Sequence, residues 1–173
     1  MESRAKLFGH AVHPILIVFP LGLLATAVIF DIVYLFSGTS MYATVAYWMM
    51  TAGLIGGFLA APFGWYDWFN IPSGTRAKTI GLTHGFANTT AILFFLISWA
   101  MRVGFPERPE MMASVLSIIG FLFALFGGWL GGELVERLGV GVDDGANLNA
   151  PNSLTSSTAS PSNPPRTTTA QKM

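Results

Sequence analysis

Histidine is the residue type in this chain best suited to chemistry near neutral pH, and it occurs at His10, His13 and His84. A neutral imidazole is the commonest metal ligand in proteins. Two imidazoles from different helices can ligate a b-type haem on both faces and support electron transfer. Alternatively, two histidines with Asp67 or Glu133 can hold a divalent metal ion. The sequence alone leaves both alternatives open.

Other chemistries find little support in the sequence. It contains no cysteine, which excludes disulfides, iron–sulfur clusters and covalent haem attachment. No Walker loop, nucleophile elbow or HExxH motif occurs, so we expect a non-enzymatic protein. Nine Lys and Arg balance nine Asp and Glu, and we therefore expect no nucleic-acid partner.

The elements that must position the histidines are membrane helices. Charged residues make up 10% of the chain and hydrophobic residues 52%, whereas a soluble domain carries about 25% charged residues. Charge-free stretches cover residues 7–30, 32–66, 79–101 and 111–132, and about 20 apolar residues cross a bilayer. We predict an all-α fold, a four-helix transmembrane bundle with spans at about 14–36, 42–64, 80–101 and 111–132.

The residues outside the four spans predict a disordered C-terminal tail and the orientation of the protein in the membrane. Residues 1–142 form the four-span domain, and residues 143–173, rich in Ser, Thr, Pro and Asn, are predicted to be disordered. A cytoplasmic N-terminus would place five basic residues inside and two outside. The bias predicts that both termini lie in the cytoplasm. The inner residues are Arg4, Lys6, Arg76, Lys78 and Arg137, and the outer ones are Arg102 and Arg108.

On this topology the polar side chains gather at the cytoplasmic end. Those that accompany the histidines there are Asp67, Asn88 and Glu133. His84 and Asn88 are four residues apart and share a helix face. The residue before a proline avoids helical geometry, which predicts that His13 is a helix cap. If the segment before Pro14 is helical, His10 and His13 share a face. Structural roles are an alternative for every one of these groups.

The carboxylates also have structural interpretations. Asp67 is predicted to pair with Arg76 or Lys78, and Glu133 to cap a neighbouring helix or pair with Arg137.

Asp31, near the outer interface, is expected to be solvated or hydrogen-bonded to a neighbouring helix. Pro20 is predicted to kink the first span. Gly53 and Gly57, with the glycines at 127, 128, 131 and 132, predict close helix packing inside the monomer.

Three stretches of the sequence together resemble a known family. They are residues 9–20 (GHAVHPILIVFP), residues 64–88 with the segments GWYDW, IPSGTRA and GLTHGFAN, and residues 128–142 with GxxGGELV and GVGV. This combination resembles the bacterial four-span membrane proteins called domain of unknown function 2231, over roughly residues 5–142.

The resemblance implies a small bacterial inner-membrane protein without an established activity. Some members are fused to cytochrome c or Rieske-type domains, which implies a redox setting. The motif positions carried over are His13, Asp67, His84, Asn88 and Glu133. Many members have a histidine where this chain has Val18, so a mechanism that needs that imidazole is not available here.

These observations lead to two functional hypotheses. The first is an electron-transfer module with a b-type haem or a metal at the cytoplasmic end, ligated by His84 with His13 or His10. The second is a structural or assembly subunit without a cofactor. The expected partners are the lipid bilayer and either a membrane redox partner or a second copy of the chain. A transporter is disfavoured, because no charged residue is predicted at mid-membrane.

Overall fold

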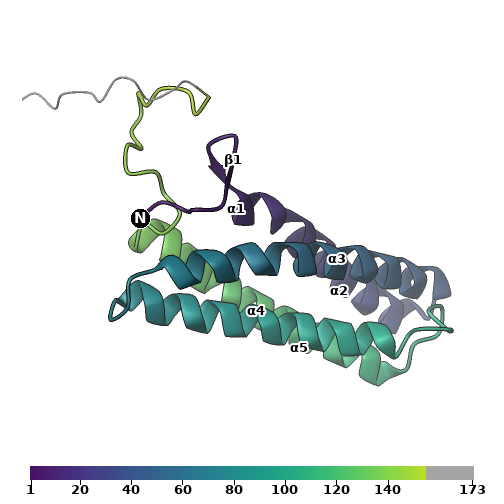
Figure 1. The fold of residues 1–173 in the computed structure, drawn as a ribbon. Helices are drawn as coiled ribbons and strands as arrows, with labels where there is room; N and C mark the ends of the chain where they lie inside the picture. Colours follow the sequence, from purple (N-terminus) through teal and green to yellow (C-terminus); the bar gives the residue numbers. More distant parts are fainter. Residues whose placement is uncertain (155–173) are drawn as a thin grey trace, which may run out of the picture.

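Four long helices form an elongated bundle in the computed structural model, which describes residues 1–154 (Figure 1). The elements in chain order are β1 (Lys6–Leu7), β2 (His10–Ala11), α1 (Val12–Leu16), α2 (Val18–Ser37), α3 (Ser40–Asn70), α4 (Arg76–Ala100), α5 (Met111–Gly132) and the π-helical turn η1 (Glu133–Arg137). The four-helix prediction is confirmed, because α1–α2, α3, α4 and α5–η1 are each long and apolar enough to cross a membrane.

Helix bounds differ most from the prediction around the α3–α4 connection. α3 has 31 residues, which corresponds to about 46 Å at 1.5 Å per residue and exceeds the hydrocarbon thickness. α4 begins at Arg76, because the hydroxyl of Thr75 caps the helix by accepting a hydrogen bond from the Lys78 amide at 3.1 Å. The long end of α3 therefore carries Asp67 and Trp68 along the first turns of α4.

The bundle consists of two antiparallel hairpins. α2 packs along α3, and α4 packs along α5, while contacts between the two pairs are fewer. The first hairpin turns at Gly38, whose φ of 66° suits a residue without a Cβ. Gly53 lies against Leu24 within the first hairpin, and Gly57 lies against Ile92 of the second. These glycines pack inside the monomer, as predicted.

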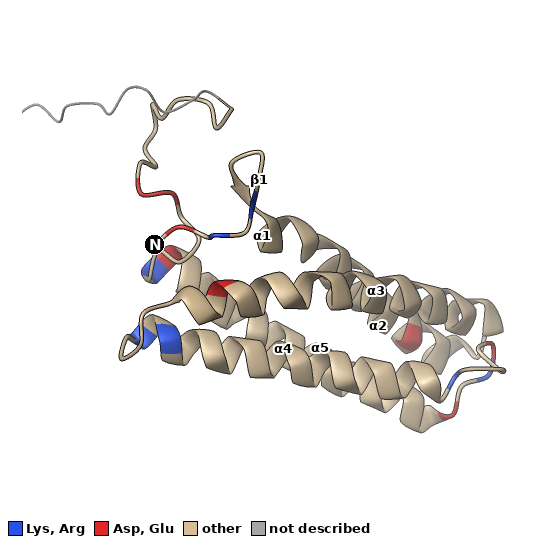
Figure 2. Cartoon of the chain, in the orientation of Figure 1, with Lys and Arg blue, Asp and Glu red and all other residues tan. Residues whose placement is uncertain are grey.

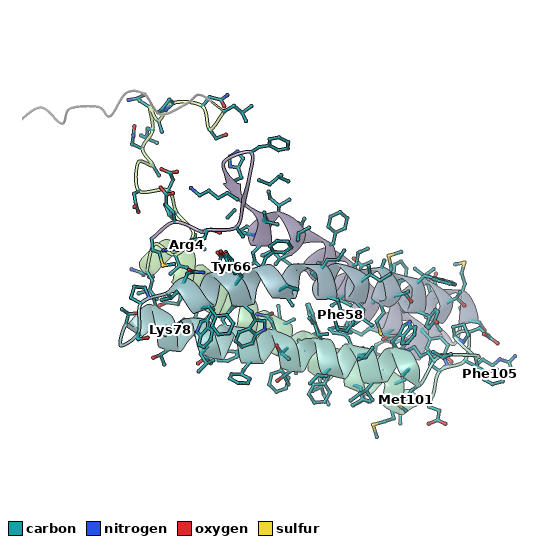
Figure 3. All side chains as sticks on the ribbon, in the orientation of Figure 1. Arg4, Phe58, Tyr66, Lys78, Met101 and Phe105 are labelled. Carbon is teal, nitrogen blue, oxygen red and sulfur yellow. The ribbon has the colours of Figure 1, made fainter. Side chains whose placement is uncertain are left out.

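The outer surface of the bundle is suited to lipid. Large apolar side chains such as Phe58 are more than half exposed and project outward along the helices (Figure 3). Charged residues gather toward the two ends of the bundle (Figure 2). A hydrophobic core of Leu24, Met50 and Phe95 with their neighbours fills the interior. The distribution is that of a membrane-embedded bundle, apolar both inside and outside.

The start of the first span differs from the prediction at His13. The condition for His10 and His13 to share a helix face is not met, because residues 6–11 contain a small antiparallel hairpin. His13 lies within α1 and is not its cap, which is Ala11. The first span, for which we predict a kink at Pro20, is interrupted at Ile17, between α1 and α2. Leu16 is the residue whose carbonyl Pro20, lacking an N–H, cannot bond.

The predicted tail lies only partly within the described residues. Residues 143–154 are described, and Asp143 and Asp144 contact the N-terminal segment through Lys6 and Met1. Residues 155–173, the remainder of the predicted disordered tail, lie outside the described residues.

Candidate functional site

Two of the three histidines meet inside the bundle. His13 of α1 and His84 of α4 have ring centroids 6.4 Å apart and ring planes at 83°. Both side chains are half-buried, whereas His10 is exposed in β2, next to Ser153. The structure therefore brings together His13 and His84 and leaves His10 outside. We call the end of the bundle that carries this pair and the 71–75 loop the histidine end.

Backbone carbonyls fix the orientation of both imidazoles. The Nδ1 atom of His13 lies 3.1 Å from the carbonyl oxygen of Ala60, and Nδ1 of His84 lies 2.8 Å from that of Gly127. A carbonyl oxygen only accepts hydrogen bonds, so Nδ1 carries the proton in both rings. In the neutral rings each Nε2 then retains an unprotonated lone pair. Those lone pairs are the groups that a metal or a hydroxyl would engage.

Asn88 lies over the face of the His84 ring. Its Nδ2 donates to the carbonyl oxygen of His84 at 2.9 Å and is 3.3 Å from both ring nitrogens. An atom equally distant from both nitrogens lies over the ring and not along either in-plane lone pair. Asn88 thus positions His84 without engaging its Nε2 lone pair.

Glycines provide the space for these side chains. A Cβ at Gly64 would lie 2.8 Å from Cε1 of His13, and one at Gly131 would lie 3.2 Å from Cε1 of His84. A Cβ at Gly127 would approach the Asn88 amide to 2.6 Å. The glycines that the sequence suggested for close helix approach in α5 therefore accommodate polar side chains of α4.

A partly open cavity of about 180 Å³ adjoins the two histidines. All four long helices contribute to its wall, which is mostly apolar. The indoles of Trp65 and Trp68 line it together with His13, His84 and Asn88. Small residues form much of the remaining wall, and they include Ala25, Gly57, Ala60, Ala61, Ala124 and Gly128. Apolar cavities of about 150 Å³ are large enough to bind benzene.

Asp67 has a different partner from the predicted ones. Both its carboxylate oxygens lie 2.8 Å from the hydroxyl oxygen of Ser3, whose single O–H donates to the carboxylate, and Oδ1 also accepts from the Arg4 amide at 3.3 Å. The predicted pairing with Arg76 or Lys78 is wrong, because the N-terminal segment folds over the end of α3. Lys78 instead donates to the carbonyl oxygen of Trp68 at 2.7 Å and completes the end of α3.

Glu133 pairs across helices and not along its own. Its Oε2 accepts from Nη2 of Arg76 at 2.7 Å, so the predicted pairing with Arg137 is wrong. Residues 1–154 contain no group of three His, Asp or Glu side chains placed to hold a metal ion. The hypothetical site of two histidines with Asp67 or Glu133 is therefore not assembled in this structure.

The opposite end of the bundle, which we call the ion-pair end, buries two charges that sequence reasoning kept apart. The guanidinium of Arg102 donates to both oxygens of Asp31, at 2.6 and 2.8 Å, and both side chains are fully buried. Ser117 of α5 donates to Asp31 Oδ2 at 2.6 Å, and Ser98 of α4 accepts from Arg102 at 3.2 Å. Asp31 is thus not solvated, and its bonds reach neighbouring helices.

The sequence contained a signal for this pair. Asp31 lies one to two turns before the end of α2, and Arg102 lies just after α4, at the same end of the bundle because α2 and α4 run in the same direction. Two opposite charges at similar depth favour pairing, because an isolated charge at that depth is costly. Counting Arg102 only among the outer basic residues concealed the match. Trp65 and Trp68, which were not among the expected site residues, also line the cavity.

Comparison with known proteins yields one result. A family model described as "Predicted membrane protein (DUF2231)" matches residues 9–144, which include α1 to η1 and both histidines of the pair. No curated protein and no solved structure matches the chain. The matched residues make up most of the chain and coincide with the four-helix bundle. The chain therefore belongs to the DUF2231 family of predicted membrane proteins.

Proposed function

We propose that this protein is a membrane-embedded binding module whose cavity at the histidine end takes a small, mostly apolar ring-shaped molecule. The observation that carries the proposal is the cavity of about 180 Å³ between the two hairpins, with an apolar wall and two imidazoles at its edge. Pockets with apolar walls and a few convergent polar groups are the usual form of ligand sites. Its volume suits one ring, since cavities of about 150 Å³ bind benzene.

The position of the cavity supports a ligand that comes from the membrane. The cavity is bounded by spans that the bilayer surrounds, and its wall includes Leu24, Ile92 and Phe121. A charged ligand would find no charged side chain there, because the titratable groups that line the cavity are His13 and His84. A neutral ring that partitions into lipid meets both requirements.

Fluorine NMR on the purified protein in mild detergent tests this proposal. We expect 4-fluorotoluene, an apolar single ring, to bind saturably. Gly128→Leu should abolish binding, because a Cβ at Gly128 meets nothing within 4 Å and its side chain enters the edge of the cavity.

Gly132→Leu is the matched control for this experiment. Gly132 is one turn further along α5, also has open space at its Cβ, and is not part of the cavity wall. This variant should bind like the natural protein. Absence of saturable binding to the natural protein, or equal binding by both variants, would overturn the proposal.

A redox-active metal centre is the second candidate, and the orientation of the imidazoles favours it. Ligating histidines usually donate their second ring N–H to a carbonyl or carboxylate, as Nδ1 of His13 and His84 do. The centroid spacing of 6.4 Å leaves room for one metal ion between two imidazoles with metal–nitrogen bonds of about 2.0–2.1 Å. Two protein ligands suit a b-type haem, whose porphyrin supplies the other four donors. A porphyrin would require the hairpins to separate, because the cavity is sized for one ring.

A visible spectrum and a metal analysis of protein produced with ample haem test this second candidate. A Soret band that is lost in His13→Ala and His84→Ala, but retained in His10→Ala, would support a haem between the paired histidines. His10 is a suitable control because it is exposed and lies outside the cavity. A colourless, metal-free protein would eliminate this candidate and leave the ring-binding proposal intact. If 4-fluorotoluene also fails to bind, the structural or assembly subunit becomes the better interpretation.

For the orientation, we propose a plasma-membrane protein with the histidine end facing the cytoplasm. The five basic residues predicted inside belong to this end or its N-terminal segment. Burial of Arg102 against Asp31 removes one of the two basic residues counted outside. The remaining asymmetry supports the positive-inside orientation. Accessibility of a single cysteine introduced at Gly74, in the 71–75 loop, tests it: labelling by a membrane-impermeant reagent in intact cells would contradict this orientation.

A further inference from the structure

The cavity at the histidine end differs from an ordinary apolar cavity because the two imidazoles beside it can accept hydrogen bonds from a ligand. Both Nδ1–H groups are already used on backbone carbonyls, those of Ala60 and Gly127. Within residues 1–154, no hydrogen bond reaches Nε2 of His13, and the Asn88 amide beside His84 lies over the ring face. The two imidazoles therefore present acceptors, and not donors, to a ligand.

Two further polar groups line the same cavity. Trp65, whose side chain carries an indole N–H donor, and Thr89, whose side chain carries a hydroxyl, are among the residues that line it. A ligand oxygen that both donates and accepts can bond to an imidazole and to one of these donors at once. A ketone or an ether oxygen only accepts, and it would leave the imidazole lone pairs unpaired in an apolar surrounding.

We propose that the ligand of this cavity is a neutral ring hydroxyl compound, of the phenol or hydroquinone class, whose O–H donates to Nε2 of His13 or His84. This inference rests on the proposed ring-binding function and makes its ligand specific. The aromatic ring occupies the apolar part of the cavity beside Trp65, and the hydroxyl faces the imidazole pair. The site discriminates against the ether or the quinone form of the same ring.

A matched pair of probes tests the hydrogen bond separately from the cavity. 4-Fluorophenol and 4-fluoroanisole have the same fluorinated ring, but only the phenol can donate. Fluorine NMR titration of the detergent-solubilised protein gives both affinities. We expect the phenol to bind about tenfold more tightly, which corresponds to about 1.4 kcal/mol. A site built to bond a hydroxyl leaves a buried polar group unpaired when it binds the analogue that lacks it.

Histidine variants assign the preference to its acceptors. His13→Leu and His84→Leu remove one imidazole each while retaining an apolar side chain, and at least one should reduce the preference to about threefold or less. His10→Leu should keep the full preference, because His10 is exposed and does not line the cavity. Partition of the probes into detergent is the same for every variant, so the change in the affinity ratio isolates the imidazoles.

The outcomes separate this inference from the proposed function. Tighter binding of the phenol, reduced in a cavity histidine variant, supports the ring-hydroxyl assignment. Equal binding of both probes overturns it but leaves the ring-binding function standing. Failure of both probes and of 4-fluorotoluene overturns both proposals. A hydroquinone with an isoprenoid chain identifies the source of the ring: tighter binding than 4-fluorophenol indicates a membrane quinol, and weaker binding a small free phenol.

Discussion

The two ends of the bundle bury polar side chains in opposite ways. At the ion-pair end, Asp31 and Arg102 bond to each other and are fully buried. At the histidine end, His13 and His84 are half-buried, each uses one ring nitrogen on the backbone, and an open cavity adjoins them. The first arrangement uses most of its hydrogen-bonding capacity internally, and the second leaves capacity available.

This difference separates structure from function. The buried Asp31–Arg102 ion pair cannot bind a ligand unless the pair first breaks. The ion-pair end therefore has a structural role, which is to hold α2, the end of α4 and α5 together. Among the described residues, only Arg102 Nε and Ser114 Oγ are buried there without a hydrogen-bond partner. The histidine end combines fixed rings with free acceptors, which is the arrangement of a preorganised ligand site.

The largest expected effect is at the ion-pair end. Arg102→Met leaves the Asp31 carboxylate buried and unpaired, and we expect a loss of about 3–5 kcal/mol in the free energy of unfolding. Equilibrium unfolding in mixed detergent micelles measures it. The double variant Asp31→Leu with Arg102→Met should recover most of the loss, because an apolar pair replaces the ion pair. If Arg102→Met alone lowers the free energy of unfolding by less than about 1 kcal/mol, the structural role of this end is contradicted.

The next effect is at the glycine beneath His13. Gly64→Ala places a Cβ 2.8 Å from Cε1 of the ring, and overpacking of this kind costs about 1–3 kcal/mol. The displaced imidazole should also weaken the affinity for 4-fluorophenol. Gly132→Ala is the control, because a Cβ there meets nothing within 4 Å and Gly132 is not part of the cavity wall. Similar unfolding free energies for the two variants would show that Gly64 does not position His13.

A smaller stability effect is expected when an imidazole is removed. His84→Leu loses the hydrogen bond to the Gly127 carbonyl, which contributes about 1 kcal/mol net. Its stability should therefore stay well above that of Arg102→Met. If His84→Leu lowered the free energy of unfolding as much as Arg102→Met does, the contrast between a structural ion-pair end and a ligand-binding histidine end would be contradicted.

The smallest effect concerns the N-terminal segment beyond the histidine end. A hydrogen bond from Lys6 holds the pKa of Glu2 below its ordinary value, and the Gly145 amide does the same for Asp143. Carboxylates with lowered pKa values stabilise the fold at neutral pH, and this contribution is lost as the pH falls through those values. The Asp144 amide, which donates to Glu2 at 3.1 Å, reports the change in an NMR titration.

The transition of the Asp144 amide should fall below the ordinary range of glutamate pKa values. In Glu2→Gln the bond no longer depends on a titrating carboxyl, so that transition should disappear. A midpoint within or above the ordinary glutamate range would contradict the contact between the two segments.

The fold was largely predictable, because a helix that crosses a bilayer needs a long stretch of residues without charges. Charge-free stretches of sufficient length defined the four helices, and the bounds of α5 coincide with the predicted span 111–132. The prediction was less accurate where helices extend beyond the hydrocarbon. There α3 continues to Asn70 through a segment of polar and aromatic residues. The length of a charge-free stretch does not predict how far a helix extends through such a segment.

The site was predictable in composition but not in geometry. Motif residues indicated that His13 and His84 lie at the same end, yet their approach depends on the carbonyls of Ala60 and Gly127, which any residue could supply. The partners of Asp67 and Glu133 were missed because Ser3 and Arg76 are remote in sequence. Tertiary contacts of this kind have no local signal in a single sequence.

The glycines beneath the imidazoles also constrain how this family can diverge. Gly64 with His13, and Gly131 with His84, form pairs in which a side chain on the glycine would occupy the space of the ring. Neither member can change alone without leaving a clash or a hole. In relatives, a larger residue at the position of Gly64 should therefore accompany a smaller residue at that of His13. Covariation between these positions would record the shape of the site.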